Sequence, residues 1–270
     1  MRLKTLELGD SNQWICFGGI YSNYLAVEAA LAQVSADAPA PLLCLGDLGA
    51  FGPHPDRVFP LLEEHKVSVL QGNYDDSIGH QKSDCQCGYT DPRDNYFAQL
   101  SYDYTLANTS AAHRAFLRDL PNWARMRCGD LRLLACHGSP RRVNEFLWES
   151  NCSDAFLRRL LDQYDCDVLL CTHTGIKWHR DLGKNQHVIN VGALGRPEND
   201  GTQRVWYTKL KAEREELQVE FVPVEYDAHR LAFEMEKESL PQEFIETVLT
   251  GWWTTCLEIL PFRERVQGRF

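Results

Sequence analysis

Residues 42–47 of the chain, Leu-Leu-Cys-Leu-Gly-Asp, form a short apolar run that ends in a single carboxylate, Asp47. Such a run predicts a fully buried strand. Three more polar residues follow apolar runs in the same way, namely Asn73, His137 and His173. Because open α/β sheets bind ligands at the carboxyl ends of their strands, we expect the four side chains to meet in one crevice. Imidazole nitrogen with carboxylate and amide oxygen suits zinc, manganese or iron, and the absence of a thiolate argues against a structural zinc cage.

The composition is that of an ordinary globular protein, with 44% hydrophobic and 24% charged residues among 270. A chain of this length is expected to form one large α/β domain. The net charge of −10 and the pI near 5.4 provide no basic surface for phosphate backbones, so no nucleic-acid partner is expected. Residues 1–10 lack the apolar core of a secretory signal, and no run approaches the roughly 18 apolar residues of a membrane span. We therefore expect a cytoplasmic protein.

The first 70 residues alternate between short apolar runs and stretches with helical spacing. Strands are expected at residues 13–17, 41–46 and 67–70, and helices at 24–34 and 56–65. This alternation indicates βαβ units with a parallel arrangement of strands.

The rest of the chain contains further helices and strands. Helices are expected at residues 110–120 and 153–164, and strands at 126–128, 131–136, 167–171, 186–191, 205–209 and 217–224. The short spacing of the first two strands predicts a hairpin that delivers His137. Residues 75–94 are polar and predict a long functional loop.

The C-terminal stretch has helical character and carries two adjacent tryptophans, Trp252 and Trp253. We expect residues 1–226 to form the main domain and residues 227–270 to form a helical extension docked on it through the tryptophans. Ten cysteines in a chain of this size do not indicate a disulfide framework.

Cys85 and Cys87 form a Cys-x-Cys pair inside the polar stretch. The spacing is too short for the usual zinc-ribbon pair. A loop thiol pair can bind a soft metal or form a redox couple, but stabilisation of the loop is the favoured interpretation.

Six short motifs occur at the predicted strand ends, in the following order: Leu45-Gly46-Asp47, Gly52-Pro53, Gly72-Asn73-Tyr74-Asp75-Asp76, His137-Gly138-Ser139-Pro140, Thr172-His173-Thr174 and Asn190-Val191-Gly192-Ala193-Leu194-Gly195-Arg196-Pro197. Together they resemble the calcineurin-like metallophosphoesterases, in particular the bacterial branch grouped with diadenosine-tetraphosphatase-like and Ser/Thr-phosphatase-like enzymes. The resemblance covers residues 13–224. It implies an α/β fold, a four-layer α/β/β/α sandwich, with a two-metal site at one edge where a bridging hydroxide attacks phosphorus.

The chain departs from the family pattern at one of the two metals. Family members usually carry Asp-x-His-Gly-Asn after the first strand, where this chain has Gly19-Ile20-Tyr21-Ser22-Asn23, and Gly-His-Thr-His where it has Thr172-His173-Thr174-Gly175. In the family, the ligands missing at Gly19, Tyr21 and Gly175 all belong to one metal. The ligands of the other metal, at the equivalents of Asp47, Asn73, His137 and His173, are all present. We infer that one metal site was kept and the other abandoned, with Mn, Fe or Zn as the metal if one is bound at all.

A centre with one metal is a weaker catalyst than one with two. Position 74, often the catalytic histidine of the family, is a tyrosine here. Tyr74 with Asp75 is a candidate hydrogen-bond donor to a leaving group, although a phenol with a pKa of about 10 is a poorer acid than imidazole. Asn23 and Arg196 are candidates to hold phosphate oxygens.

Two functions remain open. One is a binding protein with reduced or absent hydrolysis, whose ligand is a metal, a phosphorylated molecule or a protein partner. The other is an active phosphoesterase, acting on a small phosphate ester or a phosphoprotein through a mononuclear or atypical centre. A cleft filled by Tyr21 and Tyr74 would favour the first.

Overall fold

The computed structural model describes residues 4–36, 39–213 and 216–266, and its strands form two sheets. Within these ranges, one sheet has six strands, in the order β1 (Thr5–Ser11), β5 (Trp123–Cys128), β6 (Leu131–Cys136), β7 (Val168–Cys171), β9 (His187–Asn190) and β8 (Trp178–Asp181). The other has five, in the order β11 (Glu216–Val224), β10 (Val205–Glu213), β2 (Gln13–Phe17), β3 (Leu42–Cys44) and β4 (Ser68–Val69). The helices are α1 (Tyr24–Ser35), α2 (Val58–Glu64), α3 (Asn73–His80), α4 (Pro92–Asn108), α5 (Ala111–Asp119), α6 (Asp154–Tyr164), α7 (Ala228–Lys237), α8 (Gln242–Thr250) and α9 (Phe262–Val266), with a 3-10 turn at Pro55–Arg57.

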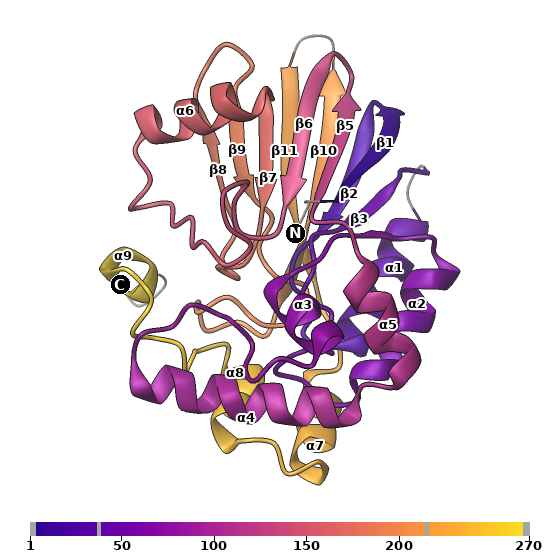
Figure 1. Ribbon diagram of the computed structural model, residues 1–270, viewed down its shortest axis with the longest axis vertical. Helices are drawn as coiled ribbons and strands as arrows, with labels where there is room; N and C mark the ends of the chain where they lie inside the picture. The colour runs from indigo at the N-terminus through magenta and orange to yellow at the C-terminus, as the bar shows by residue number, and fades with distance from the viewer. Residues whose placement is uncertain (1–3, 37–38, 214–215, 267–270) are drawn as a thin grey trace.

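The sheets pack face to face and each outer face carries helices. Trp14 and Leu43 of the five-stranded sheet share a buried cluster with Leu133 and Ile189 of the six-stranded sheet. A second cluster joins the five-stranded sheet to α1, α2, α3, α4, α7 and α8. A third joins α6 to the outer face of the six-stranded sheet. The predicted α/β/β/α sandwich is therefore confirmed, and Figure 1 shows α3, α4, α7 and α8 beyond the ends of the strands.

The strands that lead to the predicted ligands run parallel within their sheets. Strands β2, β3 and β4 are parallel neighbours in one sheet, as are β6, β7 and β9 in the other. The predicted hairpin of β5 and β6 is confirmed, as is the antiparallel pair of β10 and β11. Because these parallel strands end at the same edge of the sandwich, residues far apart in sequence meet there.

The predicted loop at residues 75–94 is wrong at both ends, because residues 75–80 belong to α3 and α4 begins at Pro92. Residues 73–80 form α3, in which the Asp75 carboxylate accepts hydrogen bonds from the amides of Gly72 and of residues outside the helix. Gly79 allows α3 to approach α5 closely, because a Cβ at that position would overlap the backbone of Arg118. The helix was missed because its polar residues serve caps and close contacts, so that no apolar periodicity remains. Helix α4 and strands β1 and β8 were also not predicted.

The helical character predicted for the C-terminal stretch is confirmed by α7, α8 and α9. Leu231, Met235 and Phe244 belong to the cluster that also contains α1. Trp253 is buried, and its indole N–H donates to the carbonyl of Pro197 at 2.7 Å. The domain boundary at residues 226/227 stays a prediction, because the extension shares its core with the sheet. None of the described helices combines the length and the apolar character needed to cross a bilayer.

Candidate metal centre

The four predicted ligands each follow a different strand at one edge of the sandwich. Asp47 follows β3, Asn73 follows β4, His137 follows β6 and His173 follows β7. Their exposed fractions are 3%, 1%, 1% and 8%. Asp47 and His173 adopt positive φ angles of 59° and 61°, an uncommon conformation for residues other than glycine. Backbone conformations of this kind cluster at functional sites, where the surrounding structure holds them.

Three acceptor atoms converge in this crevice. The Nδ1–H of His137 donates to the carbonyl of Leu45 at 2.8 Å, which leaves a lone pair on Nε2 of the neutral ring. That Nε2 lies 3.2 Å from Oδ2 of Asp47 and 3.2 Å from Nδ1 of His173. A carboxylate oxygen and bare imidazole nitrogens repel one another unless a proton or a cation lies between them.

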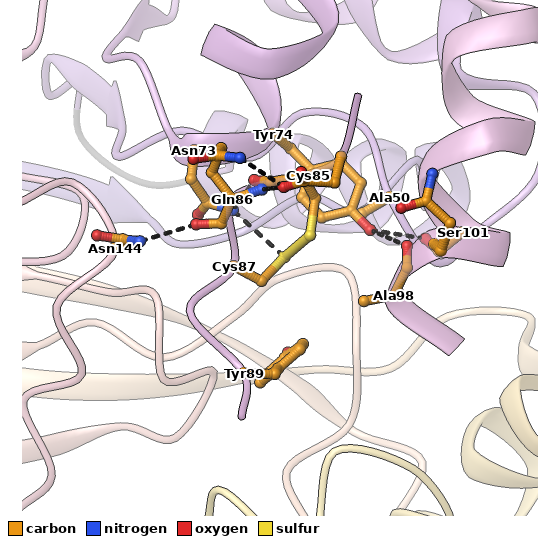
Figure 2. The surroundings of a disulfide bond; sticks show 12 residues. Ala50, Asn73, Tyr74, Cys85, Gln86, Cys87, Tyr89, Ala98, Ser101 and Asn144 are labelled. Atoms are coloured by element: carbon orange, nitrogen blue, oxygen red, sulfur yellow. Dashed lines mark hydrogen bonds between the residues drawn. A yellow bond between two sulfur atoms is a disulfide. The ribbon is translucent and has the colours of Figure 1, made fainter. Parts of the chain in front are cut away.

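The side chain of Asn73 is oriented by the Cys85–Cys87 pair, which forms a disulfide (Figure 2). Its amide nitrogen donates to the Cys85 carbonyl at 2.9 Å and to the Cys87 sulfur at 3.4 Å. Among the described residues, Oδ1 of Asn73 has no hydrogen-bond partner, although it is buried. A buried polar atom without a partner is costly, so this amide oxygen is available to a ligand.

The electrostatics of the cluster favour positive charge beside the Asp47 carboxylate. Burial raises the pKa of Asp47, but the neighbouring His137 more than offsets this and holds it below its ordinary value. Burial lowers the pKa of His137, and the Asp47 carboxylate raises it above the ordinary value. Burial and the adjacent His137 lower the pKa of His173 to about 3, so its ring is neutral and available as a ligand.

The donor set fits one transition metal. Ligands bound about 2.1 Å from a metal lie about 3.0–3.4 Å from each other, and the 3.2 Å separations at Nε2 of His137 are in this range. Asp47, His137 and His173 are also the only described group of three or more His, Cys, Asp or Glu residues with such closely placed ligand atoms. Two imidazoles and a carboxylate, with Oδ1 of Asn73 as the predicted fourth donor, suit Mn, Fe or Zn.

The other half of the crevice is filled by aromatic side chains. A Cβ built on Gly19 would overlap the ring and hydroxyl of Tyr21, so the phenol occupies the place of a side chain at position 19. A Cβ on Gly175 would lie 3.5 Å from the indole of Trp253. The positions at which the family places the ligands of its other metal therefore offer no donor except the Tyr21 hydroxyl. Burial and Asp47 raise the pKa of that hydroxyl, which keeps it protonated.

Asp75 and Tyr74, the predicted acid pair, are held by other partners. The Asp75 carboxylate accepts hydrogen bonds from the backbone amides of Asp47, Leu48 and Gly72 at 2.7, 3.0 and 2.7 Å. Burial and Asp47 raise its pKa to about 6. The structure thus gives Asp75 the role of tying the β3 and β4 loops together.

Tyr74 lines the cavity beside the cluster, but its hydroxyl lies against α4. It donates to Ser101 at 3.1 Å or to the carbonyl of Ala98 at 3.3 Å (Figure 2). Burial raises its pKa well above the ordinary value. As a proton donor to a leaving group, Tyr74 is therefore weaker than its residue type alone suggests.

The two predicted phosphate-binding residues differ in their surroundings. Asn23 caps α1: its Oδ1 accepts from the amide of Ala26 at 3.0 Å, and its Nδ2 donates to the carbonyl of Gly195 at 3.1 Å. It is not among the residues that line the cavity. Arg196 does line the cavity, together with Asp47 and His173. The geometry thus leaves Arg196 as the phosphate-binding candidate.

Sequence reasoning missed three residues that shape the site. Phe146 packs on the His173 ring with centroids 4.3 Å apart, and Tyr89 lines the cavity. Trp253, expected only as a docking residue, also covers Gly175. The only signal in the sequence was the pair of adjacent tryptophans that follows the domain with the motifs. No local pattern indicates which distant turn a C-terminal segment will cover.

Comparison with known proteins supports the fold and the family. Residues 20–213, more than half of the chain, match the calcineurin-like phosphoesterase superfamily domain. The uncharacterized protein MJ0912 of Methanocaldococcus jannaschii is 23% identical over 245 residues, which cover 86% of this chain and 95% of that protein. The crystal structure of the hypothetical protein PH1004 from Pyrococcus horikoshii OT3 is similar with a TM-score of 0.74 and 20% identity, covering 92% of this chain and 100% of that one. A metallophosphoesterase from Sphaerobacter thermophilus is similar with a TM-score of 0.67 and 23% identity, covering 88% and 98%. The two sheets, the strand-end ligands and the family match agree, and the chain belongs to the calcineurin-like phosphoesterase superfamily.

Proposed function

We propose that this protein binds one transition metal through Asp47, Asn73, His137 and His173, and acts mainly as a binding module with greatly reduced or absent hydrolysis of phosphate esters. The observation that carries the proposal is the contrast within one crevice. The ligand atoms of Asp47, His137 and His173 converge at one metal position, and Oδ1 of Asn73 is buried without a partner, while aromatic rings occupy the other position.

A metal at the four donors would supply Lewis-acid polarisation of a phosphoryl oxygen. The chain's own residues add little to cleavage. Tyr74 keeps its proton and donates it toward α4, and the Asp75 carboxylate is occupied by three amides. Loss of a general acid typically costs 10²- to 10⁴-fold in rate, which supports weak turnover at best.

An active mononuclear phosphoesterase is the second candidate function. The observation that favours it is the cavity beside the metal position, which is lined by Asp47, His173 and Arg196. The guanidinium of Arg196 therefore lies where a phosphate would bind. On either proposal the ligand is a phosphorylated small molecule or a phosphoprotein, and a protein partner is the remaining class for the binding function. We also propose a cytoplasmic location and no nucleic-acid partner, in keeping with the net charge of −10.

The test is metal content by elemental mass spectrometry, on protein purified without added metal and again after incubation with Mn²⁺, Zn²⁺ or Fe²⁺. We expect about one equivalent in the wild type and near zero in His137→Ala. His229→Ala is the matched control, because His229 is an exposed histidine on helix α7, which carries none of the four ligands, and it should keep the metal. Absence of metal from the wild type under all three conditions would overturn the proposal.

Turnover of a phosphomonoester and a phosphodiester, measured on the same samples, separates the two candidate functions. A metal-loaded protein without turnover above that of His137→Ala is the result expected for a binding module. Turnover that appears with the metal and disappears in His137→Ala would establish the phosphoesterase instead.

A further inference from the structure

Arg196 is a buried cation with few partners. Its exposed fraction is 9%, and its guanidinium donates one hydrogen bond, to the carbonyl of Thr255 at 3.2 Å. Its Nε has no acceptor, and in the described part of the chain no carboxylate lies within the 4.0 Å of an ion pair. A buried charge without a counter-ion costs several kcal/mol, so this arrangement points to a missing anion.

Aromatic rings position the guanidinium without neutralising it. Its central carbon lies 3.9 Å from the centroid of the Trp253 ring and 5.0 Å from that of Phe51. Cation–π contacts of this kind offset about 0.5–2 kcal/mol. They also hold the plane of the guanidinium, which is the geometry needed to bind two oxygens of one phosphate.

The space in front of Arg196 is small and is shared with the metal ligands. The cavity has a volume of about 60 Å³ and is lined by Asp47, His173, Arg196 and several aromatic residues. An ordered water needs roughly 10–15 Å³ on this measure, and pockets for drug-sized ligands have roughly 300–1,000 Å³. The cavity therefore accommodates a tetrahedral oxyanion but not a nucleotide.

Two tyrosine hydroxyls near the guanidinium supply neutral donors. Tyr21 and Tyr89 line the same cavity as Arg196. A phenol hydroxyl can donate a hydrogen bond to an anion without adding negative charge.

We infer that Arg196 supplies the positive charge of the abandoned metal position, and that a tetrahedral phosphoryl oxyanion binds between Arg196 and the metal held by Asp47, Asn73 and the two histidines. This inference deepens the proposed function and rests on it. It names the ligand as free phosphate or the phosphoryl group of a small ester, with the Tyr21 and Tyr89 hydroxyls as further donors. Esters too large for the cavity require displacement of the C-terminal segment, which lines the cavity through Thr255 and Cys256.

The test is isothermal titration of the metal-loaded protein with inorganic phosphate and, separately, with phosphoserine. Arg196→Met keeps a long apolar side chain against Trp253 but removes the charge, and should weaken phosphate binding about 10- to 100-fold. Arg204→Met is the matched control, because Arg204 also lies over a tryptophan, Trp206 at 5.7 Å, but is exposed and outside the cavity. Arg196→Lys should retain part of the affinity, which guards against a folding defect in the methionine variant.

Each outcome separates the inference from the proposed function. If Arg196→Met keeps its metal content but loses its affinity for phosphate, both the inference and the proposed function are supported. If Arg196→Met keeps its metal content and binds phosphate as tightly as the wild type, the inference is overturned. The same holds if the metal-loaded wild type binds no phosphate. Neither result contradicts the proposed metal site. If the wild type holds no metal, the proposed function fails, and the same pair of variants titrated without metal decides whether Arg196 binds the anion by itself. Binding of phosphate but not phosphoserine identifies free phosphate as the ligand, and binding of both identifies the phosphoryl group of an ester.

Discussion

The two halves of the crevice differ in what occupies them. In the retained half, donor atoms of Asp47 and His137 lie 3.2 Å apart, and Oδ1 of Asn73 is buried without a partner. In the filled half, the Tyr21 ring covers Gly19 and the Trp253 ring packs near Gly175. Unpartnered polar groups cost free energy, whereas packed rings stabilise the fold. The retained half is therefore arranged for a metal, and the rings of the filled half stabilise the fold in place of a second metal.

The largest expected effect comes from opening the filled half. Replacement of a buried tryptophan by alanine typically costs about 3–5 kcal/mol of stability. Because Trp253 lies in a small cluster, Trp253→Ala should lower the free energy of unfolding by an amount near the lower end of this range. Urea unfolding measures the loss. Phe262→Ala, in the same C-terminal stretch but 77% exposed, is the control and should change little. Metal content should survive in folded Trp253→Ala, and its loss would mean that the two halves are not independent.

Added metal should stabilise the folded protein through the retained half alone. At a free concentration of 100 times the dissociation constant, a ligand that binds only the folded state adds about 2.7 kcal/mol. The melting temperature of the wild type should rise with added metal and fall again on chelation, whereas that of His137→Ala should not respond. An equal rise in His137→Ala would place the metal elsewhere.

Restoring a carboxylate to the filled half should be unfavourable while Tyr21 is present. Gly19→Asp forces a side chain into the Tyr21 ring, and overpacking of this kind typically costs about 1–3 kcal/mol. Gly9→Asp is the matched control, because a Cβ on Gly9 meets nothing within 4 Å. The cost should shrink in a Tyr21→Ala background, as a double-mutant cycle would measure. Equal costs in both backgrounds would show that the phenol does not occupy that space.

The same contrast explains which parts of the site were predictable. Apolar runs that end in Asp47, His137 and His173 are local patterns, and the parallel sheet converts them into neighbours, so the sequence was sufficient for the fold and for the meeting of these side chains. Asn23 and Asp75 carry the right functional groups, but hydrogen bonds to backbone amides use them. The placement of Trp253 depends on a C-terminal segment whose path follows from packing, not from any periodicity. Residue type predicted which groups have donor atoms, and only the tertiary structure shows which of those atoms are free.

The smallest expected effect concerns the support of Asn73 in the retained half. The Cys85–Cys87 pair accepts both described hydrogen bonds of the Asn73 amide nitrogen, and loss of such support typically weakens metal binding 10- to 100-fold. Replacing both cysteines by serine should cost about 10-fold, near the lower limit, because the Cys85 carbonyl remains as an acceptor. Competition with a chelator measures the affinity, and Gln86→Ala, in the same loop with the disulfide intact, is the control. Wild-type protein treated with a thiol reductant should match the serine variant. If both retain full affinity, Asn73 is held by its place at the start of α3, and the disulfide serves only the loop.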